Sequence, residues 1–160
     1  HRPRIEVLAE AAPDLFALET VPDVDEAHAL VAVIAELHLP AWLSYTIDGP
    51  RTRAGQPLAD AFAVASGVPE IVAVGVNCSA PQDVLPAIRI AREIVDKPVI
   101  VYPNSGEGWD AQRRRWLGPK SYAPALVRDW IAAGASIVGG CCRVTPSDIA
   151  ELATQVRGRR

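Results

Sequence analysis

Five short apolar runs alternate with longer stretches of helical character, and this alternation constrains the fold more than any other feature. Four of the runs are apolar at successive positions, whereas the second is more mixed. A strand that is apolar on both faces is typical of a parallel sheet covered by helices. The sequence therefore predicts an α/β fold with a parallel sheet. The expected strands are 14–20, 41–47, 71–77, 97–103 and 135–140.

Helices are expected between and around these runs. Asp23 and Ser79 each stand three positions before an acid or an amide, which is the spacing of a capping box at a helix start. Pro146 suits a first helical position, and Gly134 stands where a glycine commonly ends a helix. The expected helices are 3–12, 24–38, 57–66, 79–95, 121–133 and 146–156.

Two parallel-sheet architectures fit such an alternation of strands and helices. No glycine-rich phosphate-binding motif follows any of the strands, which disfavours a nucleotide-binding doubly wound fold. A (β/α)₈ barrel takes ~250 residues, so five βα units in 160 residues match the last five-eighths of a barrel. We expect a single domain over 1–160, with no second domain. The irregular stretch 103–120 is expected to be either a substrate-covering loop or a disordered one.

Composition narrows the range of partners and compartments. The formal net charge of −3 gives no general attraction to nucleic acid or to anionic membranes. No apolar run reaches the ~20 residues of a membrane span, and no apolar export signal is present. With only three cysteines, a disulfide framework is disfavoured and the reducing cytoplasm is expected.

The cysteines lie at the ends of two predicted strands. Cys78 directly follows the third strand, and Cys141 and Cys142 follow the fifth. The carboxyl ends of parallel strands share one rim, and barrel curvature would turn these ends toward a common centre. Three thiolates suit zinc with its fourth position open. Gly139 and Gly140 would let the backbone bend through positive φ. The alternative is that the cysteines only pack, because free cysteine is often buried.

The motifs GVNC, VYPNSGE and GGCCRVTPSDI, in this order and spacing, resemble the homocysteine S-methyltransferase family. LETVPDVDEA and the looser SYTIDGPRTRAGQPLADA also resemble that family, so that the likeness covers essentially the whole chain. It is closest to the branch that uses S-methylmethionine. The resemblance implies a zinc-dependent methyltransferase that moves a methyl group from a sulfonium donor, S-methylmethionine or S-adenosylmethionine, to homocysteine and gives methionine. Betaine is a less favoured donor.

The resemblance also implies roles for individual residues. It implies that zinc is held by the cysteines of GVNC and GGCC, namely Cys78, Cys141 and Cys142. Glu19 would hold the amino group of homocysteine, and Asn77 would help to shape the same pocket. Tyr102 and Asn104 would line the site. The residues themselves leave alternatives open, since Glu19 also suits an exposed charge at a strand end, and Tyr102 and Asn104 also suit packing and turn formation.

The chain lacks part of the family's barrel. The family barrel begins with three strands that have no counterpart here, and the chain contains no Met. We therefore expect a fragment, which is completed by the missing N-terminal strands, associates with an identical copy, or is poorly active on its own. Two other hypotheses remain at this point. One is a non-catalytic zinc-binding or assembly module, and the other is an unrelated α/β domain in which the cysteines only pack.

Overall fold

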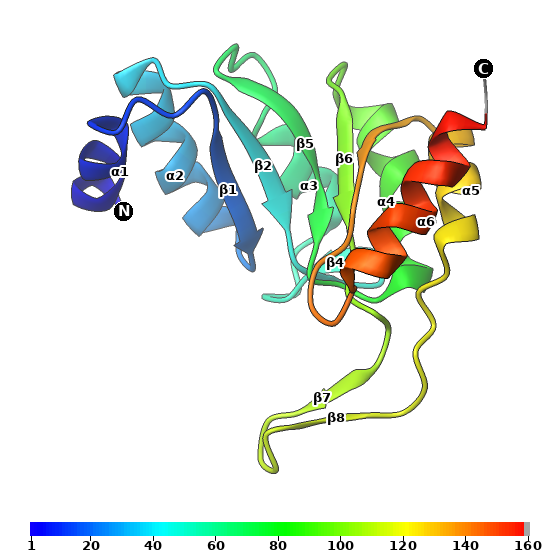
Figure 1. The fold of residues 1–160 in the computed structure, drawn as a ribbon. Coiled ribbons are helices and arrows are strands. Elements are labelled where there is room, and N and C mark those ends of the chain that lie inside the picture. The colour runs from blue at the N-terminus through cyan, green and yellow to red at the C-terminus, as the bar shows by residue number, and fades with distance from the viewer. Residues whose placement is uncertain (159–160) are drawn as a thin grey trace.

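The computed structural model describes residues 1–158. Its main sheet is parallel and has the strand order β1-β2-β5-β6-β9 (Figure 1). These strands are β1 (Phe16–Val21), β2 (Ala41–Tyr45), β5 (Ile71–Asn77), β6 (Val99–Tyr102) and β9 (Ala135–Val138). Two small antiparallel hairpins are added, one formed by β3 (Ile47–Asp48) and β4 (Arg51–Thr52), the other by β7 (Gly108–Asp110) and β8 (Arg115–Leu117).

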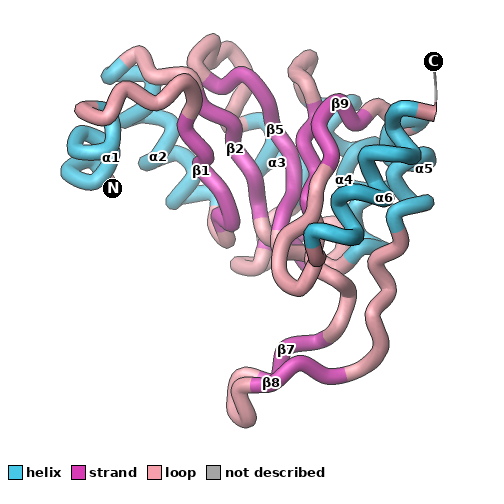
Figure 2. Tube along the Cα trace, viewed as in Figure 1, coloured by secondary structure: helices cyan, strands magenta, loops and turns pink. Residues whose placement is uncertain are grey.

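Each strand of the main sheet is followed by a helix. The helices are α1 (Arg2–Ala9), α2 (Val24–Leu37), α3 (Leu58–Ala63), α4 (Pro81–Ile94), the 3₁₀-helix η1 (Pro124–Leu126), α5 (Val127–Ala132) and α6 (Pro146–Arg157). Helices α2, α3 and α4 lie behind the sheet, and α6 packs against α5 and η1 (Figures 1 and 2). The predicted α/β fold of the TIM-barrel type, with five βα units, is thereby confirmed. None of the described helices is long and apolar enough to cross a membrane.

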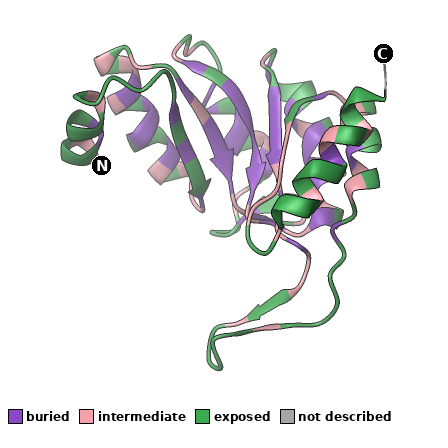
Figure 3. Ribbon diagram, in the orientation of Figure 1, coloured by how far each residue is buried: buried purple, intermediate pink, exposed green. Residues whose placement is uncertain are grey.

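A row of buried side chains crosses the sheet on its helix-covered face. Leu18, Leu43, Val74, Val99 and Ala135 are successive register partners from β1 to β9. All of them are buried in one hydrophobic cluster with the inward faces of the helices (Figure 3). Burial of one such leucine or valine side chain stabilises the fold by about 1.5–3 kcal/mol. The continuous apolar character of the strands therefore reflects this core.

The opposite face of the sheet carries a second row in register. Ala17 pairs with Trp42 on this face, and Ile100 pairs with Ile137. The Ile137 side chain is 45% exposed, because the helices α2, α3 and α4 lie on the other side of the sheet (Figure 1). In a barrel this face would be the interior, and its carboxyl end leads to the candidate site.

Helix caps agree with the sequence in part. The Asp23 side chain caps α2 as predicted. The Glu26 carboxylate does not complete the predicted capping box, because it pairs with His1 Nε2 at 2.9 Å instead. At the start of α6, Thr145 and Asp148 form a complete capping box. The Thr145 hydroxyl accepts from the Asp148 amide, and the Asp148 carboxylate accepts from the Thr145 amide.

Ser79 does not cap α4, contrary to the sequence prediction. The N-cap is Ala80, and no side chain caps this helix. The Ser79 hydroxyl accepts from the Ile47 amide at 2.9 Å and donates to the Asn77 carbonyl at 2.9 Å. It therefore joins the end of β5 to the start of β3, which is a contact between segments that the sequence does not reveal.

The expected helix 121–133 is shorter than predicted. The amides of Ser121 and Tyr122 donate to the Ser105 carbonyl at 2.9 and 2.8 Å, and this pairing holds the chain extended there. Helical structure begins only with η1 and continues into α5. Gly134 follows α5 with a φ of +114°, which confirms that a glycine ends this helix.

Residues 103–120, which we call the arm, contain regular structure that the sequence did not predict. The arm projects away from the sheet and carries the β7–β8 hairpin (Figure 1). Trp109 and Trp116 are register partners on its two strands, with ring centroids 5.2 Å apart. The Asp110 carboxylate closes the turn by accepting from the Arg113 amide at 2.9 Å. A cross-strand aromatic pair of this kind stabilises a hairpin.

Candidate active site

The three cysteines lie together at the carboxyl end of the sheet, although 62 or more residues separate Cys78 from the other two. The Sγ atoms of Cys78 and Cys142 are 3.9 Å apart, and those of Cys141 and Cys142 are 4.0 Å apart. All three sulfurs lie within 4.8 Å of one another, and all three thiols are free. Tetrahedral zinc with Zn–S bonds of 2.3 Å requires sulfurs ~3.8 Å apart. The donor set therefore fits a metal with three thiolate ligands.

The segment 102–104 lies between the two cysteine-bearing loops and hydrogen-bonds to both. Its backbone carbonyls accept from the Cys78 amide at 3.3 Å and from the Cys141 amide at 2.7 Å. The Asn104 side-chain oxygen accepts from the Cys142 amide at 3.2 Å. One strand end thus positions all three cysteine backbones, and Asn104 lies next to the candidate metal ligands.

The glycines before the cysteine pair allow close packing, whereas positive φ is found elsewhere. Gly140 has no positive φ, and a β-carbon on it would lie 2.3 Å from Val144 Cγ1. Gly139 has no positive φ either, so the prediction that these glycines bend through positive φ is wrong. Left-handed backbone occurs instead at Cys78, with φ 48°, and at Arg143, with φ 63°. One of these two strained residues, Cys78, is therefore a candidate ligand itself.

The surroundings of Cys78 and Cys142 raise the pKa of these two thiols and so favour their protonated form. Burial raises the pKa of Cys78 to about 12, and the neighbouring thiols of Cys141 and Cys142 add to this effect. Burial also raises the pKa of Cys142. A bound cation reverses this preference, because a coordinating thiol is deprotonated by the metal. Cys78 and Cys142 are therefore thiols without a bound cation and would become thiolates on binding one.

A second cluster lies on the open face of the sheet and contains two of the predicted residues. The Tyr102 hydroxyl donates to the Glu19 carboxylate at 3.0 Å and accepts from Trp42 Nε1 at 2.9 Å. Burial raises the pKa of Tyr102, so its hydroxyl remains a donor at neutral pH. Trp42 and Tyr102 also line a cavity of about 230 Å³ next to Gly139 and Gly140. The sequence did not identify Trp42 as a site residue. The mixed polar and apolar character of the second strand could have indicated that one of its faces is not part of the core.

Asn77 is buried and its side chain joins three strands. Its Oδ1 accepts from the Thr20 amide at 2.8 Å and from the Ser44 hydroxyl at 2.6 Å. Its Nδ2 donates to the Thr20 hydroxyl at 2.7 Å. These bonds fix the ends of β1 and β2 against the strand that precedes Cys78. The predicted role of Asn77 in shaping the pocket remains a prediction, and the contacts give it a means of doing so.

The larger cavity of the site, about 610 Å³, lies between the cysteines and the arm. It is bounded by Cys78 and Cys142 on one side and by Trp109 and Trp116 on the other. Asn104 also lines it. The arm therefore borders space next to the candidate metal ligands, and its role as a substrate-covering loop remains a prediction.

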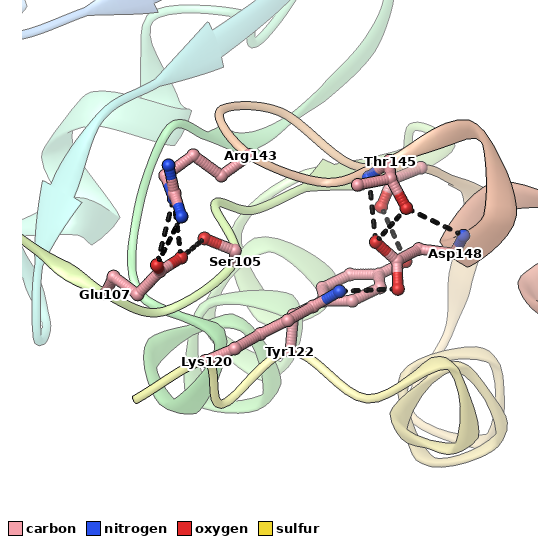
Figure 4. A network of polar contacts seen from close by, with 8 residues as sticks. Ser105, Glu107, Lys120, Tyr122, Arg143, Thr145 and Asp148 are labelled. Atoms are coloured by element: carbon pink, nitrogen blue, oxygen red, sulfur yellow. Dashed lines mark hydrogen bonds and ion pairs between the residues drawn. The ribbon is translucent and has the colours of Figure 1, made fainter. Parts of the chain in front are cut away.

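Two ion pairs hold the arm to the loop after the cysteine pair and to the start of α6 (Figure 4). At one end, Glu107 pairs with Arg143 at 2.8 Å and accepts a hydrogen bond from Ser105. At the other end, Lys120 pairs with Asp148 at 2.5 Å. The position of the arm is thereby tied to the segment 143–148, which directly follows the candidate ligands.

Comparison with known proteins agrees with this arrangement. The sequence model of the homocysteine S-methyltransferase family matches residues 1–156. Homocysteine S-methyltransferase 1 of Zea mays is 41% identical over 167 residues, covering 99% of this chain and 51% of that protein. Homocysteine S-methyltransferase of Escherichia coli K12 is 41% identical over 157 residues, covering 95% of this chain and 51% of that protein. The chain spans about half the length of these relatives.

Solved structures show the same likeness. The homocysteine methyltransferase MmuM of Escherichia coli in its metallated form superposes with a TM-score of 0.80 at 37% identity, covering 98% of this chain and 49% of that one. Its apo form gives a TM-score of 0.81, covering 97% of this chain and 54% of that one. Fold, clustered cysteines and sequence agree, and the chain belongs to the homocysteine S-methyltransferase family.

Proposed function

We propose that this chain takes part in zinc-dependent transfer of a methyl group from a sulfonium donor, S-methylmethionine or S-adenosylmethionine, to homocysteine, giving methionine. The observation that carries the proposal is the convergence of Cys78, Cys141 and Cys142 at sulfur–sulfur distances that suit tetrahedral zinc. Relatives named homocysteine S-methyltransferases and a solved relative in a metallated form support it. On this proposal, 1–160 forms the C-terminal five-eighths of a (β/α)₈ barrel, and the protein acts in the cytoplasm.

Zinc held by the three thiolates would supply the positive charge that keeps the homocysteine sulfur deprotonated at neutral pH. The residues of the chain bind and orient the rest of the substrate. Glu19 offers a carboxylate to the homocysteine ammonium group, and the hydrogen bond from Tyr102 fixes one of its oxygens. Trp42 in turn fixes the Tyr102 hydroxyl. Asn104 acts through Cys142, whose amide it holds, and is a positioning residue.

The reaction itself balances without a further co-reactant. The homocysteine thiol loses its proton to solvent, and its sulfur forms a bond to the methyl carbon of the donor. The bond between that carbon and the sulfonium sulfur breaks, and its electron pair goes to the leaving sulfur, which becomes a neutral thioether. No general base is required during the transfer, because the acceptor is already a thiolate.

The direct test is methyl transfer by the purified chain. It would be incubated with zinc, homocysteine and S-methylmethionine that carries labelled methyl groups, and labelled methionine would be measured by mass spectrometry. We expect product with the wild type and none with Cys142→Ser. His28→Gln is the control, because His28 is a potential metal ligand that is exposed on α2, away from the cluster. Equal product with Cys142→Ser would refute the proposed role of the cysteines.

A second function, zinc binding without catalysis, is favoured by one observation. All three cysteines and the segment 102–104 that positions them belong to one stretch of chain and need no other polypeptide for their hydrogen bonds. On this alternative the chain is a zinc-binding or assembly module, completed by the N-terminal strands or by a second copy. It predicts one bound zinc per chain, lost in Cys142→Ser, and no methionine from the wild-type chain alone.

A further inference from the structure

The arm presents two indole rings to the cavity that also contains the cysteines. Trp109 and Trp116 come from opposite strands of the hairpin, with ring centroids 5.2 Å apart and planes inclined by 57°. Both line the cavity of about 610 Å³ together with Cys78 and Cys142. This volume lies in the range of small-molecule sites. A ligand placed there would lie against the indoles and next to the candidate metal site at once.

The Trp109 indole is more exposed than packing of the hairpin would require, whereas Trp116 is half-buried. Trp109 is 53% exposed, although a tryptophan is the costliest apolar side chain to leave in water. The hairpin register needs only that the two rings touch each other, and it does not require them to face the cysteines. A binding role explains why such large aromatic surface is kept at the mouth of this cavity.

The charge distribution of the two indole rings favours binding of a cation. The face of an indole ring attracts a positive charge within about 6 Å of its centre. The Arg143 guanidinium already lies 5.8 Å from the Trp116 ring centroid, which shows that this ring accepts a cation in the fold. The charge of Arg143 is balanced by Glu107, whose carboxylate also lines the cavity. The two indoles therefore offer π faces to the cavity, and the positive charge nearest to them, that of Arg143, is balanced by Glu107.

We propose that Trp109 and Trp116 bind the positively charged end of the methyl donor, a sulfonium or other onium group, and so make the arm the donor-binding element of the site. This inference rests on the proposed methyl transfer and adds to it the residues that select the donor. Arg53 lines the same cavity, and its guanidinium, loosely paired with Asp48 at 3.7 Å, is available to the carboxylate of an amino-acid donor.

Binding by isothermal titration calorimetry tests the proposal with a charged and a neutral probe. S-methylmethionine is the charged probe, and 2-amino-5-methylhexanoate is its neutral isostere, with CH in place of the sulfonium sulfur. We expect Trp109→Leu and Trp116→Leu each to weaken S-methylmethionine binding by about 3- to 30-fold, and the isostere by less than 2-fold. Leu117→Ala is the control, since Leu117 is exposed on the same hairpin and does not line the cavity.

A third probe separates the two ends of the donor. Trimethylsulfonium carries the charge but no carboxylate. Its binding should fall in Trp109→Leu and stay unchanged in Arg53→Gln, whereas S-methylmethionine binding should fall in both variants. Hydrogen exchange of the hairpin amides checks that the arm keeps its structure in each variant.

Three results would overturn the inference. They are an absence of S-methylmethionine binding by the wild type, unchanged affinity in both tryptophan variants, and equal loss for the charged and neutral probes, which would mean that the indoles act only by size. The methyl-transfer assay keeps the two proposals apart. Methionine formation with unchanged KM for the donor in Trp109→Leu refutes the inference and leaves the proposed function intact. Charge-selective binding of S-methylmethionine without methionine formation supports the inference about the indoles and refutes methyl transfer by the chain.

Discussion

Removal of the Asn77 side chain should cost the fold much more than removal of the neighbouring site residue Asn104. Asn77 is fully buried and makes three hydrogen bonds with side-chain or backbone groups of Thr20 and Ser44. A typical intramolecular hydrogen bond contributes about 1 kcal/mol net, so Asn77→Ala should lower the free energy of unfolding by about 3 kcal/mol. Asn104 makes one side-chain hydrogen bond, to Cys142, and Asn104→Ala should cost about 1 kcal/mol.

Urea unfolding in the presence of a chelator measures these differences. The chelator is needed because a metal that binds only the folded state would add to the free energy of unfolding. With a slope of about 2 kcal/mol per M, the midpoint of Asn77→Ala should fall by about 1.5 M and that of Asn104→Ala by about 0.5 M. Equal midpoints for the two variants, or a loss below about 1 kcal/mol in Asn77→Ala, would refute the account of Asn77 as a joint between three strands.

Three further predictions concern the cysteine loop, the arm and the substrate side of the site. Gly140→Ala would place a β-carbon 2.3 Å from the Val144 side chain, and we expect this clash to displace the cysteine pair. Zinc affinity measured by chelator competition should fall at least about 10-fold, and an unchanged affinity would contradict the prediction. Lys120 and the Thr145 capping contacts lower the pKa of Asp148 to about 2, below the unfolded value of about 3.9, so its stabilising contribution is present above pH ~4 and is lost as the pH falls toward 2. Thermal melting should show the wild type losing its advantage over Asp148→Asn across that range, and a constant difference would speak against the ion pair. Tyr102→Phe removes the hydrogen bond to Glu19 and should raise the KM for homocysteine without changing zinc content; a loss of zinc instead would assign Tyr102 to the metal site.

The sequence was sufficient to predict the five strands of the main sheet, because apolar runs of this kind are local features. The five runs correspond to β1, β2, β5, β6 and β9, and the carboxyl ends of β5 and β9 lie at the same edge of the sheet, on either side of β6. The approach of Cys78 to Cys142 follows from that topology. The likeness to a known family added the expected chemistry of the cluster, because spacing alone did not decide between a metal site and simple packing.

What the sequence could not reveal depends on contacts between distant segments. The Ser79 hydroxyl bonds to Ile47 and does not cap its own helix, because the β3 amide lies within reach only in the folded chain. The arm lacks the short glycine turn that marks most hairpins, and its two tryptophans pair only once the strands align. Gly140 is required because a β-carbon would collide with Val144, and not because its φ is positive. No local sequence pattern distinguishes a glycine needed for close packing from one needed for positive φ.

X-ray absorption at the zinc edge of the reconstituted chain is the most direct test of the central claim that three cysteines from two strand ends form one metal site. We predict one zinc per chain with three protein sulfurs at about 2.3 Å, and a fourth sulfur after addition of homocysteine. Cys78→Ser and Cys142→Ser should each lose the metal or show one sulfur fewer. Zinc bound with fewer than three sulfurs in the wild type, or a sulfur count that homocysteine leaves unchanged, would contradict the account.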